Sequence, residues 1–367
     1  MNEFSRNKFL KAGFKVGAGL TCLTNFSGTL LGNRRNSRDE IVKKKLAKYI
    51  FNFASPYFSS DEKMTPHAHS AIKELIEKHT NNKIYVEIHD GGAKGIGSEL
   101  AKKVKLGEVQ GALLSVANLA PMMKQVDILN IPYWAANTEP YTKVFSSQIF
   151  YKHVLNDSKK YGIEILFPFI IGKRTASTTK KYGELIKSPY DFINVIFRIP
   201  GSESLKNFYK LALAIPISVP WKLAAASARA NKIEGLDSSP IGLLAGPDNL
   251  KKSIGVISMI STVHDGWVAI GNRGFVASLD ANTKNQFFDA LKEIQQVQIE
   301  RQEIAENLSI SEFEKMGTKI YRPTTSEINE LSDKFGHTHN SWTRIKRKLL
   351  GKDGVAIFDK LYDAANG

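Results

Sequence analysis

The chain has 367 residues, of which 42% are hydrophobic, and it carries a formal net charge of +15. That apolar content is too high for a disordered chain, and the length suits two lobes preceded by a leader. Beyond residue 38 there is no zinc-finger spacing, RNA-binding aromatic signature or arginine-rich run, so we expect no nucleic-acid partner. The excess of lysine is typical of a solvated surface, and it also speeds the approach of anionic ligands.

Residues 1–32 predict an export signal. A polar, basic start is followed by a small and apolar stretch over residues 12–23, which continues unevenly to residue 31. This order is typical of a cleaved signal peptide, so we expect the mature chain in the periplasm. Lys15 and Asn25 interrupt the stretch, which is too short for a good membrane span. A non-cleaved anchor or a disordered tail is the alternative.

The export route is indicated by residues 5–11, Ser-Arg-Asn-Lys-Phe-Leu-Lys, which are similar to a twin-arginine export box. Asn7 stands in the place of the second arginine of that box. Cys22 is the only cysteine of the chain, and Leu20 lies one place too close to it for the usual lipid-attachment motif. Residues 39–367 have no cysteine, so they form no disulfide.

After the leader, residues 33–47 are charged and poor in apolar types, which predicts a spacer. Strands and helices then alternate. We expect strands at residues 49–54, 83–89 and 112–116, and helices at residues 66–79 and 97–107. This alternation predicts an α/β fold with a mostly parallel sheet, and it assigns residues 48–170 mainly to a first lobe.

The same alternation continues in the second half of the chain. We expect strands at residues 163–171, 195–200 and 215–219, and helices at residues 201–214 and 222–230. Residues 171–260 are therefore assigned mainly to a second lobe. Residues 261–367 should hold a returning strand, a long helix over residues 282–317 that lies across both lobes, and short C-terminal helices. In open α/β sheets, ligands bind beyond the carboxyl ends of the strands.

No catalytic or metal-binding motif emerges. The glycine-rich turn at residues 91–97 lacks the Gly-Lys-Ser/Thr of a phosphate loop and the third glycine of a dinucleotide fingerprint. Two histidine pairs occur, His67 with His69 and His337 with His339. Neither pair has a cysteine or a fixed carboxylate spacing beside it, so zinc is not expected. His264-Asp265 is accompanied by no serine elbow or cysteine nucleophile. We therefore expect that the protein binds no metal ion and no cofactor and that it is not an enzyme.

The most informative polar residues are two arginines. Arg198 lies inside an otherwise apolar strand, where a buried guanidinium is costly unless an anion pairs with it. That anion is either an internal carboxylate or a ligand carboxylate held by two parallel hydrogen bonds; an edge position facing solvent is the other possibility. Arg174 follows the strand that ends at Ile171, where ligands of α/β sheets bind.

Several motifs occur in one order along the chain: the strand and helix at 49–53 and 66–78, the Gly-Gly turn at 91–95, the helix end at 104–110, Ile131-Pro132-Tyr133, Gly172-Lys173-Arg174, Arg198-Ile199-Pro200 and Glu234-Gly235-Leu236-Asp237. Over most of residues 48–340 the chain thereby resembles the solute-binding subunits of tripartite ATP-independent periplasmic (TRAP) transporters, of the dicarboxylate-type (DctP) family. The resemblance implies a two-lobed periplasmic binding protein fold with hinge strands and a long bracing helix.

The resemblance also implies a binding site between the lobes. Arg198 would clamp the ligand carboxylate with help from Arg174, and Trp221 is either an aromatic wall of the pocket or part of the core. The expected ligand-binding residues are Arg198, Arg174, Ser115, Asn118, Trp221 and Ser238. Ser115 and Asn118 match cleft positions of the first lobe.

The function implied is a non-catalytic one. The protein would capture a small organic carboxylate by lobe closure and deliver it to the membrane permease subunits of a TRAP transporter. The alternative is an enzyme or a sensory ligand binder on a similar two-lobed scaffold. Glu234-Gly235 stands where the family usually has Asp-Gly, and the acidic residue that often precedes the helix at Leu223 is absent. These departures leave the identity of the ligand open.

Overall fold

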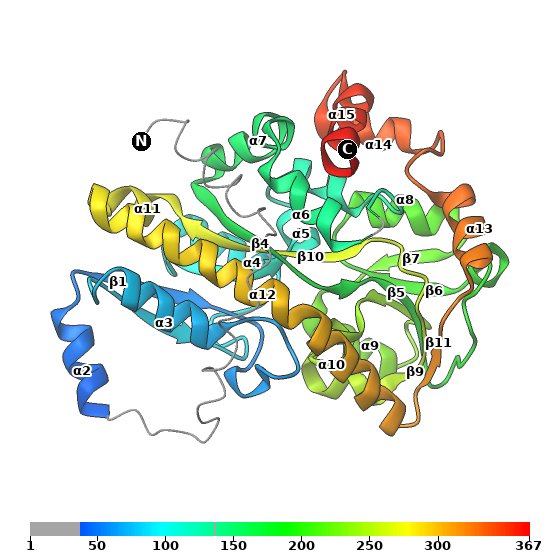
Figure 1. Cartoon of the computed structure of the whole chain (residues 1–367). Coiled ribbons are helices and arrows are strands. Elements are labelled where there is room, and N and C mark those ends of the chain that lie inside the picture. Colours follow the sequence, from blue (N-terminus) through cyan, green and yellow to red (C-terminus); the bar gives the residue numbers. More distant parts are fainter. Residues whose placement is uncertain (1–36, 136) are drawn as a thin grey trace.

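The computed structural model describes residues 37–135 and 137–367, which fold around two β-sheets (Figure 1). The predicted export signal, including Asn7 and Cys22, lies outside the described residues and stays a prediction. Within the described ranges, no helix combines the length and the apolar content that crossing a membrane requires.

The first sheet has the strand order β2-β1-β3-β10-β4. Its strands are β1 (Tyr49–Ala54), β2 (Ile84–His89), β3 (Gly111–Ser115), β4 (Ile163–Lys173) and β10 (His264–Asn272). β1 pairs in parallel with β2 and β3, and β10 runs antiparallel between β3 and β4. Parallel neighbours need long crossovers, which here contain helices α3 (His69–His79) and α4 (Ser98–Leu106).

The second sheet has the strand order β11-β9-β5-β8-β6-β7. Its strands are β5 (Thr175–Thr179), β6 (Ile196–Ile199), β7 (Ile215–Ser218), β8 (Gly235–Ser238), β9 (Ile254–Ser258) and β11 (Lys319–Tyr321). β6 pairs in parallel with β7 and β8, whereas β5 runs antiparallel to β8 and β9. Helices α8 (Glu203–Leu211), α9 (Ala224–Arg229) and α10 (Pro240–Leu244) connect these strands.

Two short connections carry the chain from one sheet to the other. Arg174 alone separates β4 from β5, and residues 259–263 join β9 to β10. The two crossings lie side by side, because the Arg174 amide donates to the Val263 carbonyl (2.8 Å) and the Thr262 amide donates to the Arg174 carbonyl (3.3 Å). Short, paired crossings of this kind are typical hinges between lobes.

Helix α12 (Ala281–Lys315) braces both lobes, as predicted (Figure 1). It packs on α3 and β4 of the first lobe and on α10 and β11 of the second. Phe287, Leu291 and Ile294 are buried at its start, and Phe313 is buried at its end. Where the helix passes the end of β4, the side-chain amide of Gln298 donates to the carbonyl of Ile170 (2.8 Å).

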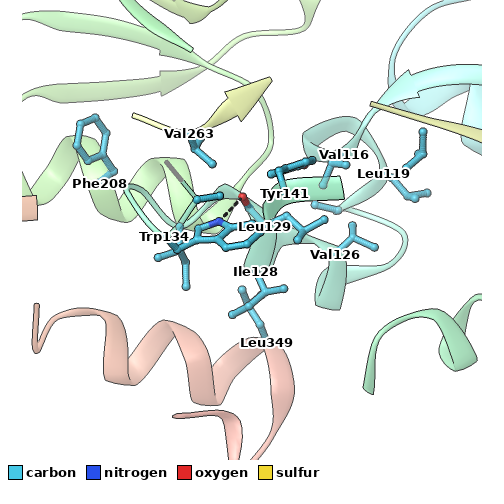
Figure 2. Packing of buried hydrophobic residues seen from close by; sticks show 14 of the residues in the cluster. Val116, Leu119, Val126, Ile128, Leu129, Trp134, Tyr141, Phe208, Val263 and Leu349 are labelled. Carbon is cyan, nitrogen blue, oxygen red and sulfur yellow. Dashed lines mark hydrogen bonds between the residues drawn. The ribbon is translucent and has the colours of Figure 1, made fainter. Parts of the chain in front are cut away.

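One apolar core runs beneath both sheets. Figure 2 shows its centre, where Trp134 packs among side chains from both lobes and its indole N–H donates to the Leu129 carbonyl (3.2 Å). Val116 comes from α5 (Val116–Leu119) near the first sheet, Phe208 from α8 and Leu349 from α14 (Trp342–Leu350). Further α-helices are α6 (Thr138–Ser146), α7 (Gln148–His153), α11 (Arg273–Ser278), α13 (Thr325–Phe335) and α15 (Gly354–Asn366).

The predicted spacer at residues 33–47 is wrong over most of its length, because Ser37–Leu46 form helix α2. Polar contacts rather than an apolar face tie this helix to the first lobe, which explains why composition concealed it. Glu40 lies 3.0 Å from the Lys73 ammonium and accepts a hydrogen bond from the Tyr85 hydroxyl (3.2 Å). Lys44 forms a further ion pair with Glu87 (2.8 Å).

The first histidine pair is buried behind the loop that follows β1. The rings of His67 and His69 lie 3.6 Å apart, centroid to centroid, and both residues are 2% exposed. The His69 amide donates to Nδ1 of His67 (3.2 Å), so the neutral ring carries its proton on Nε2, which donates to the Phe58 carbonyl (3.0 Å). Burial lowers the pKa of His67 to about 4, and burial together with His67 lowers that of His69.

We expect the protein to lose stability as the pH falls from 6.5 to 4. An unfolded histidine has a pKa near 6.5, so in this range the unfolded chain binds a proton that folded His67 excludes. The loss from His67 should approach roughly 3 kcal/mol at the acidic end. Urea unfolding at pH 7.5, 5.5 and 4 measures it. The His67→Gln variant keeps the carboxylates, which also titrate in this range, but lacks the titrating imidazole. If the stability of that variant depends on pH as strongly as that of the parent, His67 is not the cause.

Candidate ligand-binding site

A cavity of about 650 Å³ lies between the two lobes. This volume is within the range of roughly 300–1,000 Å³ that small-molecule sites occupy. The first lobe contributes the segments that follow the carboxyl ends of β1, β2 and β3, and the second lobe contributes residues at the ends of β6 and β8. All six sequence-predicted site residues line it: Ser115, Asn118, Arg174, Arg198, Trp221 and Ser238.

Arg198 is a buried cation without an acidic partner among the described residues. It lies on β6, with Leu236 of β8 on one side and Ile217 of β7 on the other, and is 3% exposed. Its Nε donates to the Val219 carbonyl (2.9 Å), and its guanidinium carbon lies 4.8 Å from the centre of the Trp221 ring. Burial, with the nearby charge of Arg174, lowers the pKa of Arg198 to about 9. The group is therefore still charged at neutral pH.

Arg174 has two internal carboxylate partners. Its guanidinium donates to Asp237 of β8 through Nη1 and to Asp265 of β10 through Nη2, the latter at 2.8 Å. Burial opposes its charge, yet Asp265 and Asp237 hold the pKa of Arg174 above its ordinary value. Because β8 belongs to the second sheet and β10 to the first, this ion pair network connects the lobes at the hinge.

Neutral donors complete the network. The Tyr209 hydroxyl donates to Asp237 (2.9 Å), and the Ser238 hydroxyl donates to Asp265 (3.2 Å). Burial raises the pKa of Asp237, against the attraction of Arg174. Ser238 thus reaches the cavity while its hydroxyl proton serves Asp265.

The two predicted site residues of the first lobe, Ser115 and Asn118, lie at α5. The Ser115 hydroxyl oxygen caps this helix by accepting a hydrogen bond from the Asn118 amide (3.2 Å). The Asn118 carbonyl accepts from the Ser98 hydroxyl (2.7 Å). Its side-chain amide borders Gly97, where an added Cβ would stand 3.4 Å from Asn118 Oδ1. Both residues are thereby fixed by backbone contacts, and the Asn118 amide lies at the cavity wall.

Sequence reasoning missed the aromatic part of the wall. Tyr57 and Phe58 follow β1, and Trp267 lies on β10, with its ring centre 5.0 Å from that of Tyr57. The first two follow a predicted strand, so their place could have been inferred; Trp267 lies on a strand that was expected only in outline. Gly91 has a φ of +56°, and a Cβ there would come within 2.2 Å of the Phe58 ring. The glycine-rich turn therefore serves close packing.

Neither predicted histidine pair forms part of this wall. In the described part of the chain, no group of three or more His, Cys, Asp or Glu side chains is placed to hold a metal ion. The two rings of the second pair have different hydrogen-bond partners: His337 bonds to the Tyr133 carbonyl (3.0 Å) and His339 to the Ser341 hydroxyl (2.9 Å).

A protein family fits this architecture. The model of the bacterial extracellular solute-binding proteins, family 7 (DctP), matches residues 55–344. The chain belongs to this family. Membership in DctP confirms the resemblance inferred from the sequence, and it establishes a solute-binding protein rather than an enzyme.

A curated DctP protein is a distant relative. The chain is 22% identical over 271 residues to the C4-dicarboxylate-binding periplasmic protein DctP of Rhodobacter capsulatus. The matched region covers 73% of this chain and 77% of the relative.

Solved structures share the two-lobed fold, which is thereby confirmed. The sugar acid binding protein DctPAm of Advenella mimigardefordensis, in complex with galactonate, has a TM-score of 0.74 at 17% identity, covering 86% of this chain and 97% of that one. A TRAP periplasmic solute binding protein from Sulfurospirillum deleyianum, with bound succinate, has a TM-score of 0.73 at 16% identity, covering 86% and 99%.

Proposed function

We propose that this DctP protein captures a small organic carboxylate outside the cytoplasmic membrane and delivers it to the membrane permease subunits of a TRAP transporter. The observation that carries the proposal is Arg198, a buried cation in the inter-lobe cavity that no described carboxylate pairs. A buried charge of this kind is costly until an anion joins it, so the site is built for an acid.

The names and bound ligands of related proteins support a carboxylate as the ligand. The Rhodobacter capsulatus relative is named for C4-dicarboxylates, and the similar structures hold galactonate and succinate. These ligands differ in size and in number of hydroxyl groups but share a carboxylate. The shared group is what Arg198 would hold, with Asn118 and Trp221 contacting the rest of the ligand.

Closure of the lobes would couple capture to delivery. We assign residues 48–170 mainly to the first lobe and residues 171–260 mainly to the second, with hinges at Arg174 and residues 259–263. A ligand that contacts Asn118 in one lobe and Arg198 in the other favours the closed form, because only that form offers both contacts. The permease would then recognise the closed form.

The first test is to identify the acid. Native mass spectrometry of protein purified without refolding should show an adduct with the mass of a small carboxylic acid. Small-angle scattering with that acid at saturation should then give a smaller radius of gyration than the ligand-free protein. An adduct whose mass fits no carboxylic acid would contradict carboxylate capture, and an unchanged radius of gyration would contradict closure.

We also propose export by a cleaved signal, with twin-arginine transport as a candidate route. The mature chain should begin within residues 32–39, directly before or at the start of α2. N-terminal sequencing of protein from the periplasmic fraction tests this. A sequence beginning at Met1 or Asn2 would rule out cleavage.

A further inference from the structure

The wall of the inter-lobe cavity is close to charge balance, although the whole chain is strongly basic. Its charged side chains are Asp61, Glu99, Asp237, Asp248, Asp265, Arg174, Arg198, Lys222 and Lys251. Five acids thus face four bases, and Glu99 forms an ion pair with Lys103, which is not part of the wall (3.1 Å). A wall balanced in this way offers no surplus of positive charge for a ligand with two negative charges.

Four charged residues of the wall are buried, namely Arg174, Arg198, Asp237 and Asp265, and we call them the floor of the cavity. This floor offers one cation to a ligand. Arg174 is already shared between Asp237 and Asp265. Arg198 makes a hydrogen bond to the Val219 carbonyl and contacts the Trp221 ring, and the two aspartates act on it only from beyond ion-pair distance. A ligand carboxylate at Arg198 therefore uses the charge that is available. A second carboxylate at the floor would share a low-dielectric space with the two aspartates and would be repelled by them.

The remaining bases are poorly placed to compensate. Lys222 is exposed and Lys251 is half-buried. Water and salt screen a charge at an exposed position, so such a lysine contributes little to a net interaction. Asp61 and Asp248, in the same wall, equal these two lysines in formal charge.

Aromatic side chains supply the uncharged part of the wall: Tyr57, Phe58, Trp221 and Trp267. Trp221 lies directly against the Arg198 guanidinium and is half-buried. Whatever is attached to a carboxylate at Arg198 consequently begins close to Trp221, whose ring is covered on one face by the guanidinium. Flat apolar faces at a ligand site favour a ring that can stack on them.

On the basis of the proposed function, we propose that the ligand is a cyclic monocarboxylate: one carboxylate held by Arg198 on a ring that packs against Trp221. The cavity selects against dicarboxylates, because Asp237 and Asp265 occupy the second arginine. Both a hydroxylated ring, as in a uronic acid, and a bare ring, as in an aromatic acid, have this chemistry.

The test is calorimetric titration of the full-length mature protein with matched acids at pH 7.5. D-glucuronate is compared with D-glucarate, which has a second carboxylate and an open chain in place of the ring. Benzoate is compared with isophthalate, which differs from it by the second carboxylate alone. The monocarboxylate of at least one pair should bind about tenfold or more tightly than its dicarboxylate partner. Which pair binds tells a hydroxylated ring from a bare one. Equal or tighter binding of the dicarboxylates, or of linear succinate, would overturn the inference and leave carboxylate capture standing.

Two variants test the ring contact. Trp221→Leu should weaken the bound monocarboxylate roughly 3- to 10-fold, while Trp221→Phe, which keeps an aromatic face, should stay within about threefold. Equal losses in both variants would overturn the stacking role. If a dicarboxylate binds and Lys222→Ala weakens it, the rim rather than the floor supplies a second cation, which also overturns the selection. Failure of all five acids to bind would overturn this inference, whereas the proposed function falls only if native mass spectrometry also finds no acid on the purified protein.

Discussion

Replacing Arg198 with alanine should weaken carboxylate binding by roughly 30-fold to several thousand-fold. Removal of one partner from a buried, hydrogen-bonded charge pair typically costs about 2–5 kcal/mol, and each 1.4 kcal/mol corresponds to about tenfold in affinity. Arg198 has no acidic partner among the described residues, so we expect the ligand carboxylate to be its partner in the complex. Calorimetry with the acid found by native mass spectrometry measures the effect.

The same substitution should leave the free energy of unfolding unchanged or raise it, because it removes a buried charge that is unpaired in the ligand-free protein. Arg198→Lys is the matched control. Lysine keeps the positive charge but cannot form two parallel hydrogen bonds, so its affinity should also fall. If Arg198→Ala binds within about threefold of the parent, Arg198 is not the clamp.

The sequence indicated Arg198 because the signal is local: it is a single charge in a run of apolar residues, and that run forms a strand between two others. The role of Arg174 could not be found in the same way. Its partners Asp237 and Asp265 lie 63 and 91 residues further along the chain, and no local pattern records which carboxylate meets which arginine. The ligand contact expected for Arg174 therefore stays a prediction beside an observed structural role.

Secondary structure, too, could be predicted where the signal is local and not where distant segments determine it. The strand at residues 49–54 coincides with β1, since its aromatic residues alternate toward a buried face. β5, in contrast, is built from threonine, serine and alanine, and it forms because it lies between β8 and β9. The short C-terminal helices expected from the sequence cover residues 326–335 and 353–365, so helix α14 was missed. It carried a signal nonetheless, because Trp342, Ile345 and Leu349 are buried at spacings of three and four.

Replacing Arg174 with alanine should destabilise the fold by about 3–5 kcal/mol, the usual cost of breaking a buried ion pair from one side. The substitution leaves Asp237 and Asp265 buried without their cation, and both residues are less than 5% exposed. Denaturant unfolding at pH 7 measures the change. Arg198→Ala, at a similarly buried guanidinium without acidic partners, is the matched control and should not show this loss.

The pH dependence distinguishes lost pairing from lost packing. A buried, unpaired carboxylate has a folded-state pKa above its unfolded value, so its penalty falls as the pH drops and the group takes up a proton. The stability gap between Arg174→Ala and the parent should therefore narrow from pH 7 to pH 5. Adding Asp237→Asn and Asp265→Asn to the variant should recover part of the stability at pH 7, because it removes both unpaired charges. A gap that is constant with pH and unaffected by the asparagines would mean that Arg174 acts through packing alone.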